Sequence, residues 1–129
     1  MKKITLQIVM VFLFALMVSA TANSANSPVK KVTGEDLQAL LADGGQITVV
    51  DVREGRAFKS GHIPGAVNIP YNGRDKEHFT RLGKEERIVF VCYGGTMSND
   101  IAGILLDDGY KYVYNLQRGM FGWHGELER

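Results

Sequence analysis

Cysteine, histidine and proline are all scarce in this 129-residue sequence, which contains 1 Cys, 3 His and 3 Pro. A lone Cys has no partner within its own chain, so an internal disulfide framework is excluded. The His and Cys residues are too few and too scattered for a structural zinc site, which needs four ligands. We therefore expect no metal.

The sequence also lacks an excess of charge of either sign. Its 15 Lys and Arg residues nearly balance 14 Asp and Glu residues, which leaves a formal net charge of +1. Without a basic field to hold a polyanion, nucleic-acid binding is not expected. A hydrophobic fraction of 45% over this length indicates one small globular domain.

The first 22 residues have the composition of a secretory signal peptide. Lys2 and Lys3 precede an unbroken apolar run over residues 8–18, and the small-residue triplet Ala20–Ala22 follows. The run is shorter than the roughly 20 residues needed to span a bilayer. We predict a signal peptide over 1–22 with cleavage near 22–25, and an uncleaved N-terminal anchor is the alternative.

The predicted organisation after cleavage is a flexible leader over residues 23–28 and one domain over 29–129. Export places the domain in the periplasm, with no stable membrane anchor. An oxidising compartment makes a free thiol unusual. Cys92 is therefore either buried and inert or kept for its chemistry.

Short apolar, β-branched segments alternate with helical patterns along the rest of the chain. Lys30 and Lys31 start the first predicted strand, and four more are expected over 47–52, 66–69, 88–91 and 112–116. Helices are predicted after the N-cap Thr33, over 56–60, within 74–83, over 99–106 and within 118–128. The alternation predicts an α/β fold with a parallel sheet and helices on both faces.

Cys92 follows one of these strands, and ligand sites in parallel sheets lie at the carboxyl ends of strands. Gly94 and Gly95 allow positive φ angles, so backbone N–H groups can point inward and bind an anion. Ser98 is the expected N-cap of the next helix, whose N-terminus favours the thiolate. This pattern predicts an exposed nucleophilic sulfur surrounded by inward-facing amides. Asp51 and Arg53 end another strand, where they either support this loop or pair with each other.

Three segments resemble the rhodanese (thiosulfate sulfurtransferase) family. Residues 51–54 (DVRE) and 57–70 (AFKSGHIPGAVNIP) resemble the signature upstream of its active site. Cys92, followed by Gly95 and Ser98, resembles the active-site loop, and the pattern over 106–123 resembles the closing segment. The similarity spans residues 30–125, and with the signal peptide the chain is similar to short exported bacterial rhodaneses.

The resemblance implies a five-stranded parallel sheet and a reaction through a Cys92 persulfide. The Cys92 thiolate takes the outer sulfur of thiosulfate, releases sulfite, and passes the sulfur to cyanide or another thiophilic acceptor. No cofactor is implied, and the expected protein is a monomer. The resemblance implies that the six-residue loop from Cys92 to Met97 holds the persulfide by its backbone N–H groups. The expected persulfide-binding residues are Tyr93, Gly94, Gly95, Thr96, Met97 and Ser98.

The loop departs from the family pattern at its second and sixth positions. Many thiosulfate-using members carry Arg or another polar residue there, whereas this chain has Tyr93 and Met97. A dianionic donor thereby loses charge-assisted hydrogen bonds, each worth about 1.5–3 kcal/mol. Arg53 and Arg118 are the candidates to supply the missing charge.

Two other functions remain as alternatives. The uncharged loop positions favour a sulfur carrier or partner-binding module without turnover. A phosphatase of related fold would need Arg six residues after the Cys, where this chain has Ser98. Outside the loop, His62 is predicted to shape a turn, and Phe121 and Trp123 to close the core.

Overall fold

The computed structural model describes residues 28–129. The predicted signal peptide and residues 23–27 of the predicted leader lie outside the described residues. Between residues 28 and 129, no helix is both long enough and apolar enough to cross a membrane.

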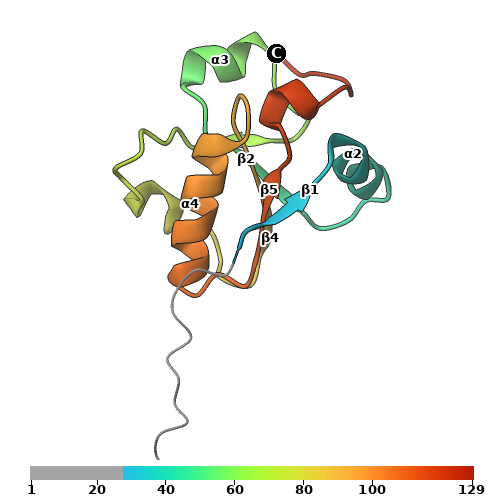
Figure 1. Ribbon diagram of the computed structural model, residues 1–129. Helices are drawn as coiled ribbons and strands as arrows, with labels where there is room; N and C mark the ends of the chain where they lie inside the picture. Colours follow the sequence, from blue (N-terminus) through green and yellow to red (C-terminus); the bar gives the residue numbers. More distant parts are fainter. Residues whose placement is uncertain (1–27) are drawn as a thin grey trace, which may run out of the picture.

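Five parallel strands form a single sheet in the order β1-β5-β4-β2-β3 (Figure 1). This order confirms the predicted five-stranded parallel α/β sheet. The strands are β1 (Lys30–Val32), β2 (Thr48–Asp51), β3 (Val67–Asn68), β4 (Arg87–Val91) and β5 (Tyr112–Leu116).

Helices cover both faces of the sheet, as predicted. The α-helices are α2 (Gly34–Ala42), α3 (Gly55–Ser60) and α4 (Thr96–Asp107). Helices α2 and α4 lie on opposite sides of the strands (Figure 1). Thr33 is the N-cap of α2, and its hydroxyl accepts a hydrogen bond from the Asp36 amide over 3.1 Å, which confirms the predicted start.

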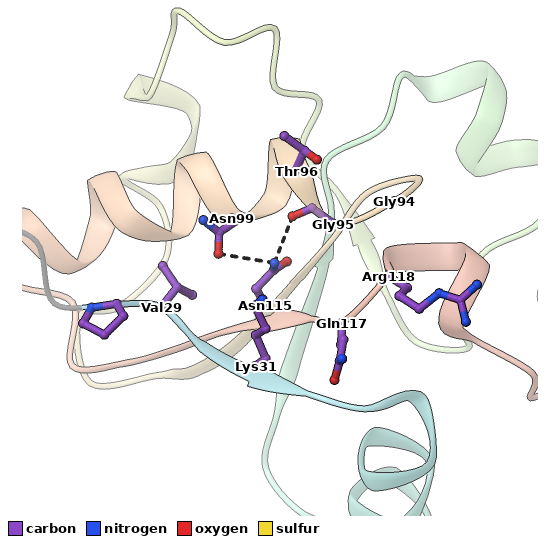
Figure 2. A pocket seen from close by; sticks show the side chains of 10 residues that line it. Val29, Lys31, Gly94, Gly95, Thr96, Asn99, Asn115, Gln117 and Arg118 are labelled. Atoms are coloured by element: carbon purple, nitrogen blue, oxygen red, sulfur yellow. Dashed lines mark hydrogen bonds between the residues drawn. The ribbon is translucent and has the colours of Figure 1, made fainter.

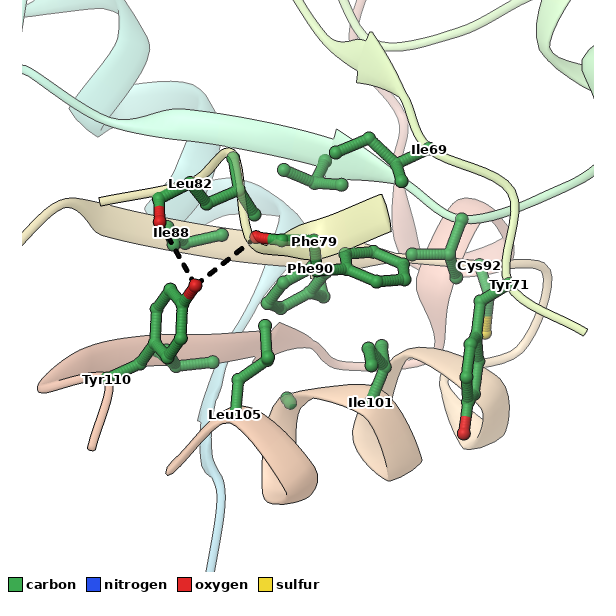
Figure 3. Packing of buried hydrophobic residues seen from close by; sticks show 14 residues of the cluster. Ile69, Tyr71, Phe79, Leu82, Ile88, Phe90, Cys92, Ile101, Leu105 and Tyr110 are labelled. Carbon is green, nitrogen blue, oxygen red and sulfur yellow. Dashed lines mark hydrogen bonds between the residues drawn. The ribbon is translucent and has the colours of Figure 1, made fainter. Parts of the chain in front are cut away.

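Side chains of the central strand β4 alternate between two hydrophobic clusters because successive residues of a strand face opposite sides. Ile88, Phe90 and Cys92 pack in the α4 cluster, which also contains Ile101 and Leu105 of the helix (Figure 3). Val89 and Val91 pack in the other cluster, together with Leu37 of α2 and Trp123. Cys92 thus continues the pattern of β4 and points toward the α4 face.

Two of the predicted helices are only short 3-10 turns. The segment 74–83 contains η1 (Glu77–Phe79), because the side chains of Asn72 and Asp75 accept nearby backbone N–H groups in place of a helix. The segment 118–128 contains η2 (Gly119–Gly122), whose N-cap is Arg118 at a positive φ of 62° and whose first residue, Gly119, has a φ of +52°. These two left-handed residues do not have the backbone of a right-handed helix.

Candidate active site

Two neighbouring strands end at the same edge of the sheet and carry the candidate residues. Strands β2 and β4 pair with Asp51 opposite Val91, and Cys92 follows directly after Val91. The pairing continues past the strand ends, where the Val52 amide donates to the Val91 carbonyl over 2.8 Å. Asp51, Arg53 and Cys92 therefore lie at one end of the sheet, as their positions after strands predict.

The loop after Cys92 enters helix α4 through Gly95, which has a φ of +101°. Helix α4 begins at Thr96, so the prediction that Ser98 is the N-cap of a helix starting at Asn99 is wrong. Gly95 takes the left-handed conformation and the N-cap position, and Ser98 falls within the first turn. The expectation of positive φ holds for Gly95 but not for Gly94.

Three donors of this loop and helix converge on the Cys92 sulfur. The Gly95 N–H lies 3.1 Å from Sγ and the Ser98 N–H lies 3.4 Å from it. Ser98 Oγ lies 3.2 Å from the same sulfur. Donors in this arrangement favour a charged sulfur over a neutral one.

Cys92 is only 3% exposed, so the prediction of an exposed sulfur is wrong. The residue keeps the alternation of β4 and turns into the α4 cluster, where Tyr71 and Ile101 also pack (Figure 3). The sulfur thus has an apolar wall on one side and the donors of the loop on the other. These donors distinguish it from a purely structural thiol, which lies among apolar groups alone.

Asp51 and Arg53 form a buried ion pair. The Arg53 Nη2 atom lies 2.7 Å from Asp51 Oδ2, and Nε donates to Oδ1 over 3.0 Å. Nη2 also donates to the Gly61 carbonyl over 2.9 Å. Burial opposes the charge of Arg53, but the hydrogen bonds and charge of Asp51 outweigh it and raise the Arg53 pKa. Of the two predicted roles for this pair, the structure has the residues paired with each other.

Tyr93 connects the second loop position to the turn after β2. Its ring lies over the Arg53 guanidinium, with 5.5 Å from Cζ to the ring centroid. Its hydroxyl donates to Glu54 Oε1. This hydrogen bond lowers the pKa of Glu54 and raises the pKa of Tyr93. Arg53 is thus held under Tyr93 and by Asp51, which leaves it little freedom to bind a donor anion.

Two cavities flank the loop. A cavity of about 610 Å³ is lined by Gly94, Gly95, Thr96 and Arg118, together with Lys31 and others (Figure 2). Cys92 is not among its lining residues. A second cavity, of about 320 Å³, is lined by Met97 together with Tyr71 and Glu54.

Asn115, the fourth of the five residues of β5, is a site residue that was not predicted from the sequence. Its Nδ2 atom donates to the Gly95 carbonyl over 2.9 Å, and its Oδ1 atom lies 2.6 Å from Ser98 Oγ. The residue is only 3% exposed. A polar side chain within the apolar strand sequence YVYNL was the available signal, because buried polar groups need hydrogen-bond partners.

The remaining predicted residues lie outside the loop. His62 stacks on Phe58 at 3.7 Å between ring centroids, and its Nδ1 atom lies 2.8 Å from the Phe58 carbonyl. Trp123 is buried, but Phe121 is 66% exposed, so the prediction that Phe121 closes the core is wrong. The Phe121 ring instead lies near Gly94, because η2 turns it outward from the core. Within residues 28–129, no group of three or more His, Cys, Asp or Glu could hold a metal ion.

Comparison with known proteins identifies the family. The rhodanese-like domain family matches residues 33–126, and the chain belongs to it. A thiosulfate sulfurtransferase, GlpE, from Shewanella oneidensis is 35% identical over 85 residues, which cover 65% of this chain and 82% of that protein. A putative sulfur carrier protein, YrkF, from Bacillus subtilis is 28% identical over 79% of this chain and 55% of its own length.

Solved structures of rhodanese-like proteins share this fold. A rhodanese-like domain protein from Staphylococcus aureus superposes with a TM-score of 0.69 at 29% identity, over 78% of this chain and 97% of that one. Sequence and structure together place the chain in the rhodanese-like domain family. The similar proteins include one named as a thiosulfate sulfurtransferase and one named as a putative sulfur carrier.

Proposed function

We propose that this protein is a sulfurtransferase that carries a sulfane sulfur on Cys92 as a persulfide. The observation that carries the proposal is the convergence of the Gly95 N–H, the Ser98 N–H and Ser98 Oγ on one sulfur atom. These groups stabilise negative charge on the sulfur of the thiolate, which is the reactive form of Cys. The backbone amides of the loop would also stabilise the charge of a persulfide bound within it.

The proposed reaction has two displacement steps. The Cys92 thiolate attacks the outer sulfur of thiosulfate, the sulfur–sulfur bond of thiosulfate breaks, and sulfite leaves with its electron pair. Cyanide or another thiophilic acceptor then attacks the outer sulfur of the persulfide. The bond to Sγ breaks, the product is thiocyanate when cyanide is the acceptor, and the Cys92 thiolate is restored.

The donor must reach a sulfur that is nearly buried. The cavity of about 320 Å³ beside Met97 and Tyr71 is the proposed entry, because both of these residues also pack in the cluster that contains Cys92. No Lys or Arg lines this cavity, whose lining residues include the carboxylates of Glu54 and Asp75 and the imidazole of His78. A dianion such as thiosulfate is therefore a weak donor here, and an uncharged or singly charged donor is favoured.

A sulfur carrier without turnover is the second candidate. It is favoured by the uncharged side chains at loop positions Tyr93 and Met97, and by the ion pair that occupies Arg53. A similar protein named as a putative sulfur carrier also supports it. A carrier would accept sulfur on Cys92 and hold it until a specific partner removed it.

A donor screen separates the two candidates. The purified protein is incubated with thiosulfate or an organic persulfide and then with cyanide, and sulfite and thiocyanate are measured over time. A sulfurtransferase makes many equivalents of thiocyanate per protein chain, and a carrier makes one equivalent or less. Failure to load sulfur from any donor contradicts both candidates.

We also propose that the protein acts in the periplasm as a monomer, after removal of residues 1–22. The support is the basic, apolar and small-residue pattern of that segment. Fractionation of the expressing cells, followed by mass measurement of the released chain, should give an N-terminus between residues 23 and 26. A full-length chain in the membrane fraction would favour the uncleaved anchor instead. Light scattering of the released chain tests the monomer.

A further inference from the structure

Ser98 stands between the reactive sulfur and the side chain of Asn115. Its Oγ atom lies 3.2 Å from Cys92 Sγ and 2.6 Å from Asn115 Oδ1. Ser98 is fully buried and Asn115 is 3% exposed. Both polar side chains therefore depend on protein partners rather than on bulk water.

The orientation of the Asn115 amide determines where the Ser98 proton lies. Asn115 Nδ2 donates to the Gly95 carbonyl over 2.9 Å, and it lies 3.5 Å from Asn99 Oδ1 (Figure 2). These acceptors place the NH₂ group toward the loop, so the Oδ1 atom faces Ser98. An amide oxygen only accepts hydrogen bonds, and the Ser98 hydroxyl must therefore be the donor to Asn115.

A hydroxyl has one proton and can donate it to only one partner at a time. While Ser98 donates to Asn115, its Oγ atom offers the sulfur only lone pairs. That arrangement suits a neutral Cys92 thiol, whose S–H can donate to Oγ. A thiolate needs the opposite arrangement, with the hydroxyl proton turned toward Sγ.

We propose that Ser98 is a positioning residue whose hydroxyl turns between Asn115 Oδ1 and Cys92 Sγ, and that Asn115 sets the balance between the two positions. This inference rests on the proposed function. The hydroxyl points to Asn115 while the sulfur is a neutral thiol or the inner atom of a persulfide. It turns to the sulfur when the thiolate is restored after transfer. No bond to hydrogen breaks in Ser98, and the thiol proton itself leaves to water.

The charged and titratable side chains of the loop and the turns beside it have partners of their own, apart from Lys31 and Arg118, which line the larger of the two cavities. The pairs are Asp51 with Arg53, Glu54 with Tyr93, and Tyr71 with Asp100. Among the described residues, the hydrogen bonds to Cys92 Sγ come from Gly95 and Ser98. The hydroxyl of Ser98 is thus the one donor to the sulfur whose direction can change, because the two amides are fixed by the backbone.

Alkylation of the thiol tests this inference without any sulfur donor. The chain has 1 Cys, so iodoacetamide reports on Cys92 alone. The rate at pH 7 is divided by the limiting rate at alkaline pH, and this ratio reflects the thiolate fraction. A failure of sulfur transfer therefore leaves the measurement intact, and the two proposals can fail separately.

Opposite effects are expected for the two residues. Ser98→Ala removes a donor to the thiolate and lowers the ratio about tenfold. Asn115→Ala releases the hydroxyl to the sulfur and raises the ratio severalfold. The double variant should match Ser98→Ala, because the proposed effect of Asn115 on the thiolate fraction requires the Ser98 hydroxyl. The control Asn99→Ala, which removes the distant partner of Asn115, should stay within about twofold of the parent.

The inference is overturned if Asn115→Ala lowers the ratio as Ser98→Ala does, because a loosened loop would give that result. It is also overturned if the double variant shows the sum of the two single effects. Circular dichroism shows whether each variant is folded. If Asn115→Ala does not fold, Ser98→Ala alone decides, and a ratio within twofold of the parent contradicts the inference.

Discussion

The turns after β2 and β4 lie side by side at one end of the sheet, yet they use their polar groups in opposite ways. After β2, the carboxylate of Asp51 and the guanidinium of Arg53 satisfy each other over 2.7 Å. After β4, two amides and a hydroxyl surround the sulfur of Cys92, and none of these groups carries a charge. The two charges of the turn after β2 compensate each other. The turn after β4 has hydrogen-bond donors that can stabilise a negative charge on the sulfur.

This difference separates a structural pair from a reactive site. Asp51 and Arg53 in the first turn and Cys92 in the second are all buried, so burial alone does not identify the chemistry. Removing one partner of a buried ion pair leaves an uncompensated buried charge, which strongly destabilises the fold. Donors that face a neutral thiol are instead ready for charge that appears during reaction. The substitutions described below test this difference between the two turns.

The largest effect is expected at the reactive turn. Cys92→Ala removes the sulfur nucleophile and should lower thiocyanate formation from a sulfur donor and cyanide by about 10³-fold or more. The domain should stay folded, because a small side chain replaces a small one. A variant that forms thiocyanate at the parent rate would contradict the role of Cys92.

A substitution in the turn after β2 should instead lower the stability of the fold. Asp51→Ala leaves the Arg53 charge buried without its partner and should lower the free energy of unfolding by about 3–5 kcal/mol. Urea denaturation measures this change, and the folded fraction of the variant should still accept sulfur on Cys92.

The exposed ion pair between Lys76 and Asp108 provides the matched control. Its charged atoms lie 2.8 Å apart, close to the 2.7 Å of the Asp51–Arg53 pair, but the two side chains are 52% and 38% exposed. Lys76→Ala should cost no more than about 1 kcal/mol. Equal losses for the two variants would mean that the Asp51–Arg53 pair is not the structural element described here.

Adding a cation to the reactive turn should sharpen its preference for an anionic donor. Met97→Arg places a guanidinium at the sixth loop position and should lower the KM for thiosulfate about tenfold. The gain should shrink at high salt, because the new interaction is electrostatic. Met97→Leu keeps the apolar side chain and should leave the KM unchanged. A KM for Met97→Arg equal to that of the parent would show that the donor does not pass this position.

The smallest effect concerns Tyr71, which shares a cluster with Cys92. Burial and the hydrogen bond to Asp100, 2.7 Å long, raise the Tyr71 pKa to about 12. The folded protein therefore holds this proton more tightly than the unfolded chain, whose tyrosines titrate near 10. The resulting stability is complete below pH 10 and is lost as the pH rises toward 12.

Urea denaturation between pH 9 and pH 11.5 measures this loss. Tyr71→Phe should show a shallower fall in unfolding free energy than the parent over that range, because the variant lacks the group that titrates. Parallel curves for the two proteins would show that Tyr71 does not contribute to the alkaline loss.

The arrangement of the fold could be predicted because its strands have a simple pattern. Segments such as 47–52 and 88–91 are apolar on both faces, which indicates a covered parallel sheet. The two 3-10 turns could not be predicted as such. Their limits depend on side chains that accept backbone N–H groups, such as Asn72, and on the left-handed backbone of Arg118.

Only the part of the site that is contiguous in the sequence could be predicted. Cys92 and its loop are contiguous in sequence, so a strand, two glycines and a following helix were enough to locate them. Asn115 reaches the loop from β5, and only the three-dimensional pairing of β4 with β5 brings it there. The burial of Cys92 was missed for a similar reason, since it depends on how α4 packs over the strand ends.

The most direct test of the central claim is the mass of the protein after exposure to a sulfur donor. We expect a gain of about 32 Da, one sulfur atom, on the peptide that contains Cys92, and cyanide should remove it. The same treatment of Cys92→Ala should leave the mass unchanged. A parent protein that gains no sulfur from thiosulfate or from an organic persulfide would contradict the account.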